Sequence, residues 1–369
     1  MPGKAGPQQS SKSGQVSRNA GNSGISGGHV HHDCPANLIP GAALLALSPR
    51  VFLPSLLLAI ILFAFWPTEN ATSETVPLPP PVTMSDKRIA FSFDDAPRGA
   101  GAFLEPDERP KLLIEALQTA GIEQAVFFIN PGRITAYDHD AADIAAYAKA
   151  GHVLANHTAK HSKLSSVTVA TFLADVDAAE VWLKDKPNYR PWFRFPFLDE
   201  GRTNRTKRDA VRAGLKQRGL MNGYVTVDAS DWYLEDMAIS AAKAGKLMDW
   251  NALRDLFVES YVESAEFSDD LARRTLDRAP VQMILLHETD LAAMFVDDLA
   301  AALKRQGWTI VPADEAYRDP IANMEPDVDF ADGTRTQMLA AERNIGNRWY
   351  KRNDQKVAKK LFAARVLRD

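Results

Sequence analysis

The segment RIAFSFDDAP, residues 88–97, decides the fold. Its first six residues form a short apolar and aromatic run that is typical of a buried strand, and two adjacent aspartates follow where this strand ends. Further short runs rich in β-branched or aromatic residues predict more strands of the same kind. They lie at residues 125–129, 152–156, 192–195, 224–227, 283–286 and 309–311.

Helical patterns lie between several of these runs. They cover residues 110–120, 140–150 and 296–306, and a glycine follows each of them. Because strands and helices alternate, we expect parallel strands, and about seven such units favour a barrel-like closure over an open sheet. The sequence therefore predicts an α/β fold in which residues at strand ends and in the following loops carry the chemistry.

Composition and charge narrow the possible partners. The chain has 369 residues, of which 46% are hydrophobic, enough for one large domain. Its formal net charge of -4 gives no field that would draw the protein to nucleic acid, so we expect no nucleic-acid partner. Cys34 is the single cysteine, so no intrachain disulfide is possible.

The pattern divides the chain into segments of different composition. They are a disordered basic tail at 1–37, an apolar signal anchor at 38–66, a Pro- and Thr-rich linker at 67–86, the barrel at 87–323 with a helical insertion at 233–279, and a helical C-terminal tail at 324–369. The last helix of the tail is basic, which indicates a solvated face or a contact with anionic lipid or polymer.

The N-terminal segments predict attachment to a membrane. Residues 51–66, VFLPSLLLAIILFAFW, carry no charge, and basic residues outnumber acidic ones in the part that precedes them. We therefore expect a single pass through the inner (cytoplasmic) membrane with the barrel on the periplasmic side. The lack of a small-residue cleavage site after Trp66 favours an uncleaved anchor over a removed signal peptide. Translation from Met84 would instead give a soluble cytoplasmic protein.

Polar residues follow two of the predicted strands directly. Asp94 and Asp95 come after the first strand, where adjacent carboxylates repel each other unless one is neutralised or both are solvated. His157 and His161 follow the third strand in the sequence HTAKH, and histidines four apart on a helical turn can bind one cation. With one carboxylate they would form a metal site that keeps positions open for water and substrate. Thr158 replaces the glutamate that zinc proteases use as a base, which disfavours a peptidase.

Five short motifs at predicted strand ends resemble those of the polysaccharide deacetylase family, also called the NodB-homology domain or carbohydrate esterase family 4. They are FSFDDAP at 91–97, GHVLANHTAKH at 151–161, RFPF at 194–197, DASDW at 228–232 and LLH at 285–287. The resemblance covers residues 88–319. It implies a distorted (β/α) barrel and the metal-dependent hydrolytic deacetylation of N-acetylated glycans such as peptidoglycan or chitin-like oligosaccharides.

The resemblance also implies roles for the first three motifs. Asp95, His157 and His161 would bind a divalent metal, usually Zn²⁺, with Co²⁺ or Mn²⁺ as other possibilities. Asp94 would be the general base. Arg194 would keep Asp94 ionised and oriented; a surface ion pair is its ordinary structural explanation.

The remaining motifs would complete the site. His287 would protonate the departing amine, and Asp231 would raise its pKa and orient its ring. The backbone N–H of Phe197 would stabilise the oxyanion. Trp232 and Leu285 would form the wall of a slot for the acetyl methyl group, although core packing would explain both equally well.

Two departures from the family pattern leave other functions open. Ala96 stands where the family typically has glycine, and the insertion at 233–279 affects the expected substrate rather than the reaction. One alternative is a related hydrolase that cleaves a non-sugar amide on the same barrel. Another is a non-catalytic glycan-binding membrane protein.

Overall fold

The computed structural model of the protein describes residues 86–105, 107–136 and 140–368. The expected basic tail, the expected membrane segment and all but the last residue of the expected linker lie outside these residues. Among the residues described, no helix combines the length and the apolar character needed to cross a membrane.

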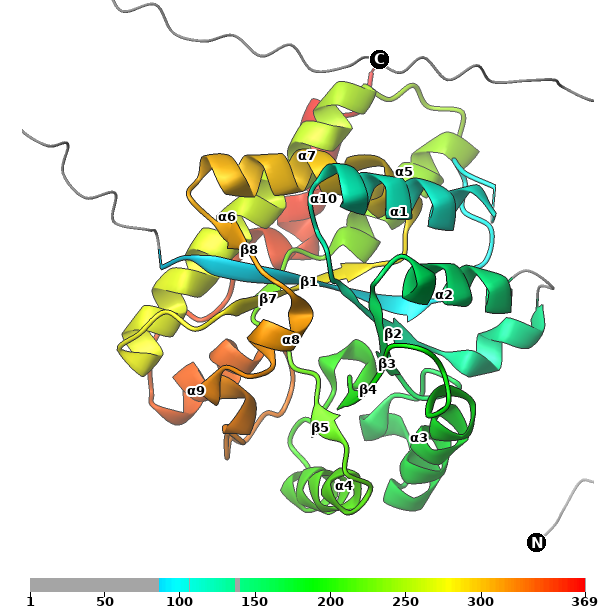
Figure 1. Ribbon diagram of the computed structural model, residues 1–369. Helices are drawn as coiled ribbons and strands as arrows, with labels where there is room; N and C mark the ends of the chain where they lie inside the picture. Colours follow the sequence, from blue (N-terminus) through cyan, green and yellow to red (C-terminus); the bar gives the residue numbers. More distant parts are fainter. Residues whose placement is uncertain (1–85, 106, 137–139, 369) are drawn as a thin grey trace, which may run out of the picture. The chain divides into compact units, whose positions relative to one another are not determined.

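A sheet of eight parallel strands forms the centre of the fold (Figure 1). The strands run in the spatial order β5-β4-β3-β2-β1-β7-β6, and β8 pairs with the start of β1. Their bounds are β1 (Arg88–Ala96), β2 (Val126–Ile129), β3 (Val153–Asn156), β4 (Tyr189–Phe193), β5 (Met221–Asn222), β6 (Val227–Asp228), β7 (Gln282–His287) and β8 (Thr309–Ile310). The prediction of a parallel, barrel-like α/β fold is confirmed.

The closure of the barrel is incomplete, because β5 and β6 end the strand order and form no pair with each other among the described residues. The strand expected at 224–227 was wrong, since two short strands flank most of that segment instead. The reason is that backbone carbonyls at the start of this region do not bond to a neighbouring strand. The Arg194 side chain donates hydrogen bonds to the carbonyl oxygens of Gly223 and Tyr224 instead. Gly223 also lies so close to the Phe128 ring that a Cβ there would be 2.5 Å from it.

Helices cover both faces of this sheet. The α-helices are α1 (Glu108–Thr119), α2 (Asp140–Lys149), α3 (Val169–Leu183), α4 (Arg205–Gln217), α5 (Asp231–Lys243), α6 (Trp250–Leu276), α7 (Asp290–Arg305), α8 (Ala313–Ala316), α9 (Arg335–Glu342) and α10 (Gln355–Arg365). The 3₁₀ helices are η1 (Pro131–Ala136), η2 (Leu164–Ser166), η3 (Pro196–Leu198), η4 (Pro320–Asn323) and η5 (Lys351–Asn353).

The predicted positions of α1 and α2 are confirmed within two residues, whereas α7 begins earlier than expected. It starts at Asp290 because the Thr289 side chain accepts a hydrogen bond from the Ala292 backbone N–H at 3.1 Å and so caps the helix. The expected insertion at 233–279 consists of α5 and α6. Because α5 begins at Asp231, the last two residues of the DASDW motif, Asp231 and Trp232, lie in its first turn.

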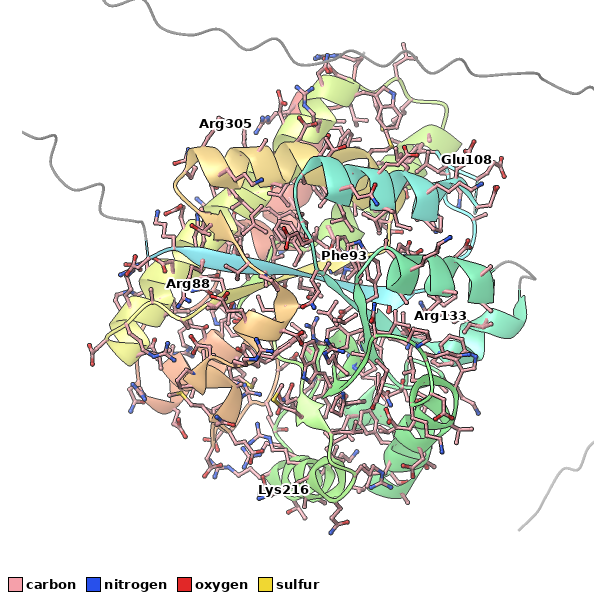
Figure 2. All side chains as sticks on the ribbon, in the orientation of Figure 1. Arg88, Phe93, Glu108, Arg133, Lys216 and Arg305 are labelled. Carbon is pink, nitrogen blue, oxygen red and sulfur yellow. The ribbon has the colours of Figure 1, made fainter. Side chains whose placement is uncertain are left out.

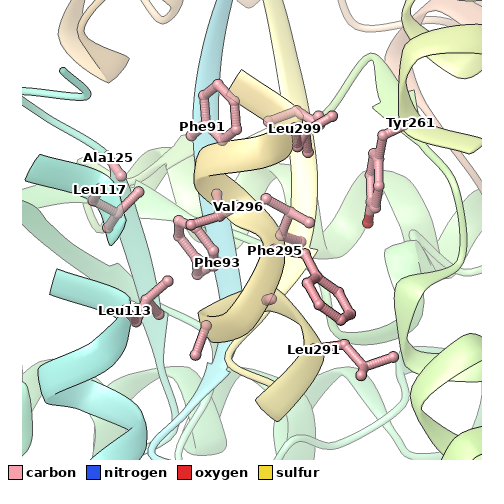
Figure 3. Packing of buried hydrophobic residues seen from close by; sticks show 14 of the residues in the cluster. Phe91, Phe93, Leu113, Leu117, Ala125, Tyr261, Leu291, Phe295, Val296 and Leu299 are labelled. Atoms are coloured by element: carbon pink, nitrogen blue, oxygen red, sulfur yellow. The ribbon is translucent and has the colours of Figure 1, made fainter. Parts of the chain in front are cut away.

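The main hydrophobic core lies between β1 and helices α1, α6 and α7. Figure 3 shows Phe295 and Val296 of α7 beside Phe93 of β1, with Leu113 of α1 on one side and Tyr261 of α6 on the other. All of these side chains are buried. Burial of this apolar surface on one face of β1 holds the strand, and therefore its carboxyl end, in a fixed position.

The C-terminal segment is part of this core rather than a solvated tail. Tyr350, Phe362 and Val366 are buried in the same cluster, and α10 packs against α5 and α6. The expectation of a solvated helix therefore holds only for the outer side of α10, where Lys356 and Lys360 are exposed.

Replacing Phe362 by alanine should lower the free energy of unfolding by about 3 kcal/mol, because a buried aromatic ring leaves a cavity when it is removed. Urea unfolding monitored by circular dichroism measures the change. Lys360→Ala, on the exposed side of the same helix, should change it by less than about 0.5 kcal/mol. Equal stability of the Phe362→Ala variant and the unmodified chain would show that α10 is not part of the core.

Candidate active site

The carboxyl ends of the central strands meet around one cavity of about 390 Å³. Asp94 of β1 is the Cα partner of His287 of β7, and β3 leads to His157 on the other side of β2. Figure 2 shows Arg88 at the start of β1 and Arg133 beside its carboxyl end, which is the end that faces the cavity. Eight of the ten residues predicted for the site line the cavity. The other two bond to residues that line it: Arg194 to Asp94 and Asp231 to His287.

Three side chains converge where a metal could bind. Asp95, His157 and His161 each offer one ligand atom, and these atoms lie within 4.8 Å of one another. The Asp95 Oδ1 atom is 3.6 Å from His157 Nε2 and 3.0 Å from His161 Nε2. The sequence therefore identified a set of potential ligands that the fold brings together.

The backbone around these ligands differs from the expected helical turn. Residues 157–161 are irregular, and Thr158 and His161 have positive φ angles of 62° and 58°. The Asn130 side chain donates to the His157 and Thr158 carbonyls at 2.6 and 2.9 Å, which holds this loop. Thus the two rings meet because the loop folds back, and not because they lie one helical turn apart.

The hydrogen bonds leave the ligand atoms available. His157 Nδ1 lies 2.9 Å from the Arg194 carbonyl, which can only accept, so Nδ1 carries a proton and Nε2 is the ring nitrogen that faces Asp95. Asp95 Oδ1 is buried and has no hydrogen-bond partner among the described residues. A buried carboxylate oxygen without a donor is costly. The donor set of one carboxylate and two imidazoles therefore fits a divalent cation such as zinc.

Asp95 is held in its ionised form. Burial alone would raise its pKa, but the contacts from His157 and His161 outweigh burial and hold the pKa of Asp95 well below its usual range. Arg98 adds a hydrogen bond to Asp95 Oδ2 at 3.1 Å, and the Arg133 guanidinium lies 3.7 Å from Oδ1. Sequence motifs gave no signal for either arginine.

A buried arginine orients the neighbouring carboxylate. Arg194 donates to Asp94 Oδ1 at 2.8 Å, and both side chains are almost completely buried. Its Nη2 atom donates to Ser92 Oγ at 3.2 Å and to the Tyr317 hydroxyl at 2.9 Å. The predicted partnership is thus present but is buried rather than a surface ion pair. Tyr317 lies outside all five motifs, so the sequence did not identify it.

On the opposite side of the cavity, His287 is paired with Asp231. Its Nδ1 lies 2.8 Å from Asp231 Oδ1, and its backbone N–H donates to Asp231 Oδ2 at 2.7 Å. Burial would lower the pKa of His287, but the charge and hydrogen bond of Asp231 outweigh it and raise the pKa to about 9. His287 is therefore protonated at neutral pH and can donate a proton into the cavity.

The apolar residues predicted for the site line the same cavity. Phe197 has a positive φ of 60°, is 57% exposed, and its ring centroid lies 4.5 Å from that of His161. Trp232 is 41% exposed on the first turn of α5, and Leu285 is buried at the end of β7. Leu198, Asp228 and Asp236 complete the lining without having been singled out for a role.

The loop after β1 is tied down by buried acidic residues that the motifs do not include. Glu288 accepts from the Arg98 backbone N–H at 2.7 Å, and Asp290 accepts from the Phe103 N–H at 2.9 Å. Arg109 pairs with Asp290 at 2.8 Å in the protein interior. These contacts hold the loop in the position in which the Arg98 side chain bonds to Asp95.

The chain matches the family described as polysaccharide deacetylase over residues 82–217. This match confirms the resemblance seen in the motifs. Six of the ten predicted site residues lie within the matched segment, and the other four lie beyond it: Asp231, Trp232, Leu285 and His287. No curated protein matches the chain.

Several solved structures match part of this chain. A family 4 carbohydrate esterase from Streptomyces lividans is 18% identical, with 63% of this chain and 96% of that chain covered and a TM-score of 0.40. Peptidoglycan deacetylase PdaC from Bacillus subtilis is 20% identical, covering 64% and 93%, with a TM-score of 0.40. BA3943, a CE4 family pseudoenzyme from Bacillus anthracis, is 17% identical, covering 67% and 69%, with a TM-score of 0.42. We draw nothing about activity from these likenesses.

Replacing Asp231 by asparagine should lower the pKa of His287 from about 9 to about 6.5 or below, because burial then acts without the compensating charge. An NMR titration of the imidazole resonances in the metal-free protein measures this shift. Asp236→Asn, an exposed position on the same helix that also lines the cavity, should leave the value near 9. An unchanged titration in the Asp231→Asn variant would show that Asp231 does not control His287.

Proposed function

We propose, from the membership of residues 82–217 in the polysaccharide deacetylase family, that this chain is a metal-dependent hydrolase that removes acetyl groups from N-acetylated glycans. The observation that carries the proposal is the composition of the cavity. A three-ligand metal set, a carboxylate oriented by arginine and a histidine protonated at neutral pH all face the same space. Peptidoglycan and chitin-like oligosaccharides are the substrates that we propose to test.

Asp95, His157 and His161 would hold the metal, most simply Zn²⁺, with Co²⁺ or Mn²⁺ as substitutes. A divalent cation at this position supplies a Lewis acid that activates water and polarises an amide carbonyl. The buried, unpartnered Asp95 Oδ1 atom and the Nε2 atom of His157, which faces Asp95, support this assignment.

The two carboxylates would have different tasks. Asp94 Oδ1 is occupied by Arg194, while Oδ2 lies 3.6 Å from His157 Nε2 and so is directed toward the ligand cluster. Asp94 would accept the proton of the attacking water through Oδ2. The contact with Arg194 restrains the rotation of the Asp94 carboxylate, so the base does not have to reorganise during the reaction.

His287 would complete the reaction from the opposite wall. Its Nδ1 is engaged with Asp231, so the proton on Nε2 is the one available to the departing amine when the C–N bond breaks. The backbone N–H of Phe197 would stabilise the developing oxyanion. Trp232 and Leu285 would exclude water from the acetyl methyl group, since both present apolar surface to the cavity.

The purified chain supplied with zinc, cobalt or manganese should release acetate from N-acetylglucosamine oligomers or from peptidoglycan. Asp94→Asn should lower kcat by about 10²–10⁴-fold, the usual contribution of a positioned base, whereas Asp236→Asn should retain activity within about threefold. Absence of acetate from every glycan, with hydrolysis of other amides, would favour a hydrolase for non-sugar amides. Tight glycan binding that is unchanged in Asp94→Asn, without any turnover, would favour a binding protein.

Metal binding can be measured independently of activity. The chain should bind one Co²⁺ with the visible absorption of a low-coordinate site, and Asp95→Asn and His161→Gln should each weaken this binding at least about tenfold. Asp236→Asn is the matched control, because its carboxylate lines the same cavity without belonging to the ligand set. Equal Co²⁺ affinity in all four proteins would rule out the proposed site.

A further inference from the structure

A second cavity of about 320 Å³ adjoins the candidate active site and lies between α5 and α10. Asp236 lines both cavities. Along α5, Trp232 and Asp236 face the candidate active site, whereas Tyr233 and Met237 face the second cavity. These pairs lie on neighbouring sides of one helix, so α5 borders both cavities, which meet at Asp236.

The second cavity has an apolar wall and a basic rim. Met237 of α5, Phe362 of α10 and Leu367 supply apolar surface. Two ammonium groups come from Lys246, just after α5, and from Lys359 of α10, and neither has an acidic partner among residues 86–105, 107–136 and 140–368. The single arginine of these two helices, Arg365, is paired, since it bonds to Glu259 at 2.6 Å. The two lysines are thus free to bind an anion.

We propose that this α5–α10 cavity binds sugar units next to the reacting sugar of the substrate, and that Lys246 and Lys359 bind a carboxylate carried by those units. The inference rests on the proposed function. A polymer whose acetylated sugar occupies the candidate active site must leave it along some surface, and α5 extends for about 16 Å from Trp232 to Lys243. Trp232 and Tyr233, with ring centroids 5.5 Å apart, offer apolar faces at the junction.

The charges favour an acidic glycan over a neutral one. Lys246 lies beyond the last residue of α5, whereas Asp236 lies in its second turn, and Lys359 lines the same cavity from α10. An anionic group of the substrate can therefore bind beyond the end of α5, away from the candidate active site. A membrane surface is a less suitable partner, because the lysines share their cavity with the buried ring of Phe362, and this cavity meets the candidate active site at Asp236.

The test compares two oligosaccharides of equal length, one neutral (N-acetylglucosamine units only) and one in which alternate sugars carry a free carboxylate. For the double variant Lys246→Ala/Lys359→Ala of the full chain, KM for the carboxylated oligomer should rise about tenfold at unchanged kcat. KM for the neutral oligomer should stay within about twofold. Raising the salt concentration should reduce the difference between the two proteins.

Lys243→Ala/Lys360→Ala is the matched control. It removes one lysine from α5 and one from α10, neither of which lines the cavity, and it should behave as the unmodified chain. The proposal is overturned if both double variants raise KM equally, if neither does, or if the neutral oligomer is affected to the same extent. It is also overturned if Lys246→Ala/Lys359→Ala abolishes binding to vesicles of anionic lipid without changing KM. Failure of the unmodified chain to release acetate from the neutral oligomer would instead refute the proposed function itself.

Discussion

Two consecutive aspartates are buried at the end of one strand, and the site depends on how their charges are compensated. Asp95 has a positive φ of 72°, so the chain turns there and the two carboxylates face different partners. Asp94 contacts Arg194, and Asp95 contacts two histidines and Arg98. Removing one partner of a buried ion pair typically costs about 3–5 kcal/mol, so each compensating group is structurally required as well as suited to chemistry.

The same arginine also stabilises the open side of the barrel. Between β5 and β6 the backbone carbonyls of Gly223 and Tyr224 lack strand partners and accept instead from Arg194. Arg335, at the start of α9, packs over the Tyr224 ring, and its backbone N–H donates to the Val225 carbonyl at 2.8 Å. Residues after the barrel therefore complete its hydrogen bonding, which explains why the C-terminal segment is folded against the domain.

Some residues of the candidate site lie in the segment that matches the polysaccharide deacetylase family, and others lie beyond it. The metal ligands, Asp94, Arg194 and Phe197 lie in the segment that matches the family. The histidine–aspartate pair lies beyond it, on β7 and α5. Helix α5 therefore contributes both to the chemistry, through Asp231, and to the neighbouring cavity, through Tyr233 and Met237. Substitutions in α5 can therefore change the residues that face the substrate without changing the candidate metal ligands.

The sequence alone predicted the alternation of parallel strands and helices, apart from the strand expected at 224–227, because strand ends and glycine stops are local signals. The ten site residues came from the resemblance of five motifs to a known family. The sequence also predicted that Asp94, Asp95 and the two histidines would come together, since the carboxyl ends of parallel strands meet at one edge of a sheet. It did not show that residues 157–161 form an irregular loop, because that conformation is held by Asn130, which is distant in the sequence.

Only the tertiary structure revealed Arg98, Arg133 and Tyr317 beside the carboxylates, and the burial of α10 in the core. The physical reason is the same in each case. A local pattern determines whether a segment is strand or helix and which residues end it, but the neighbours of a charged side chain are set by packing between elements far apart in the chain. Charge compensation and cavity shape therefore had to be found in three dimensions.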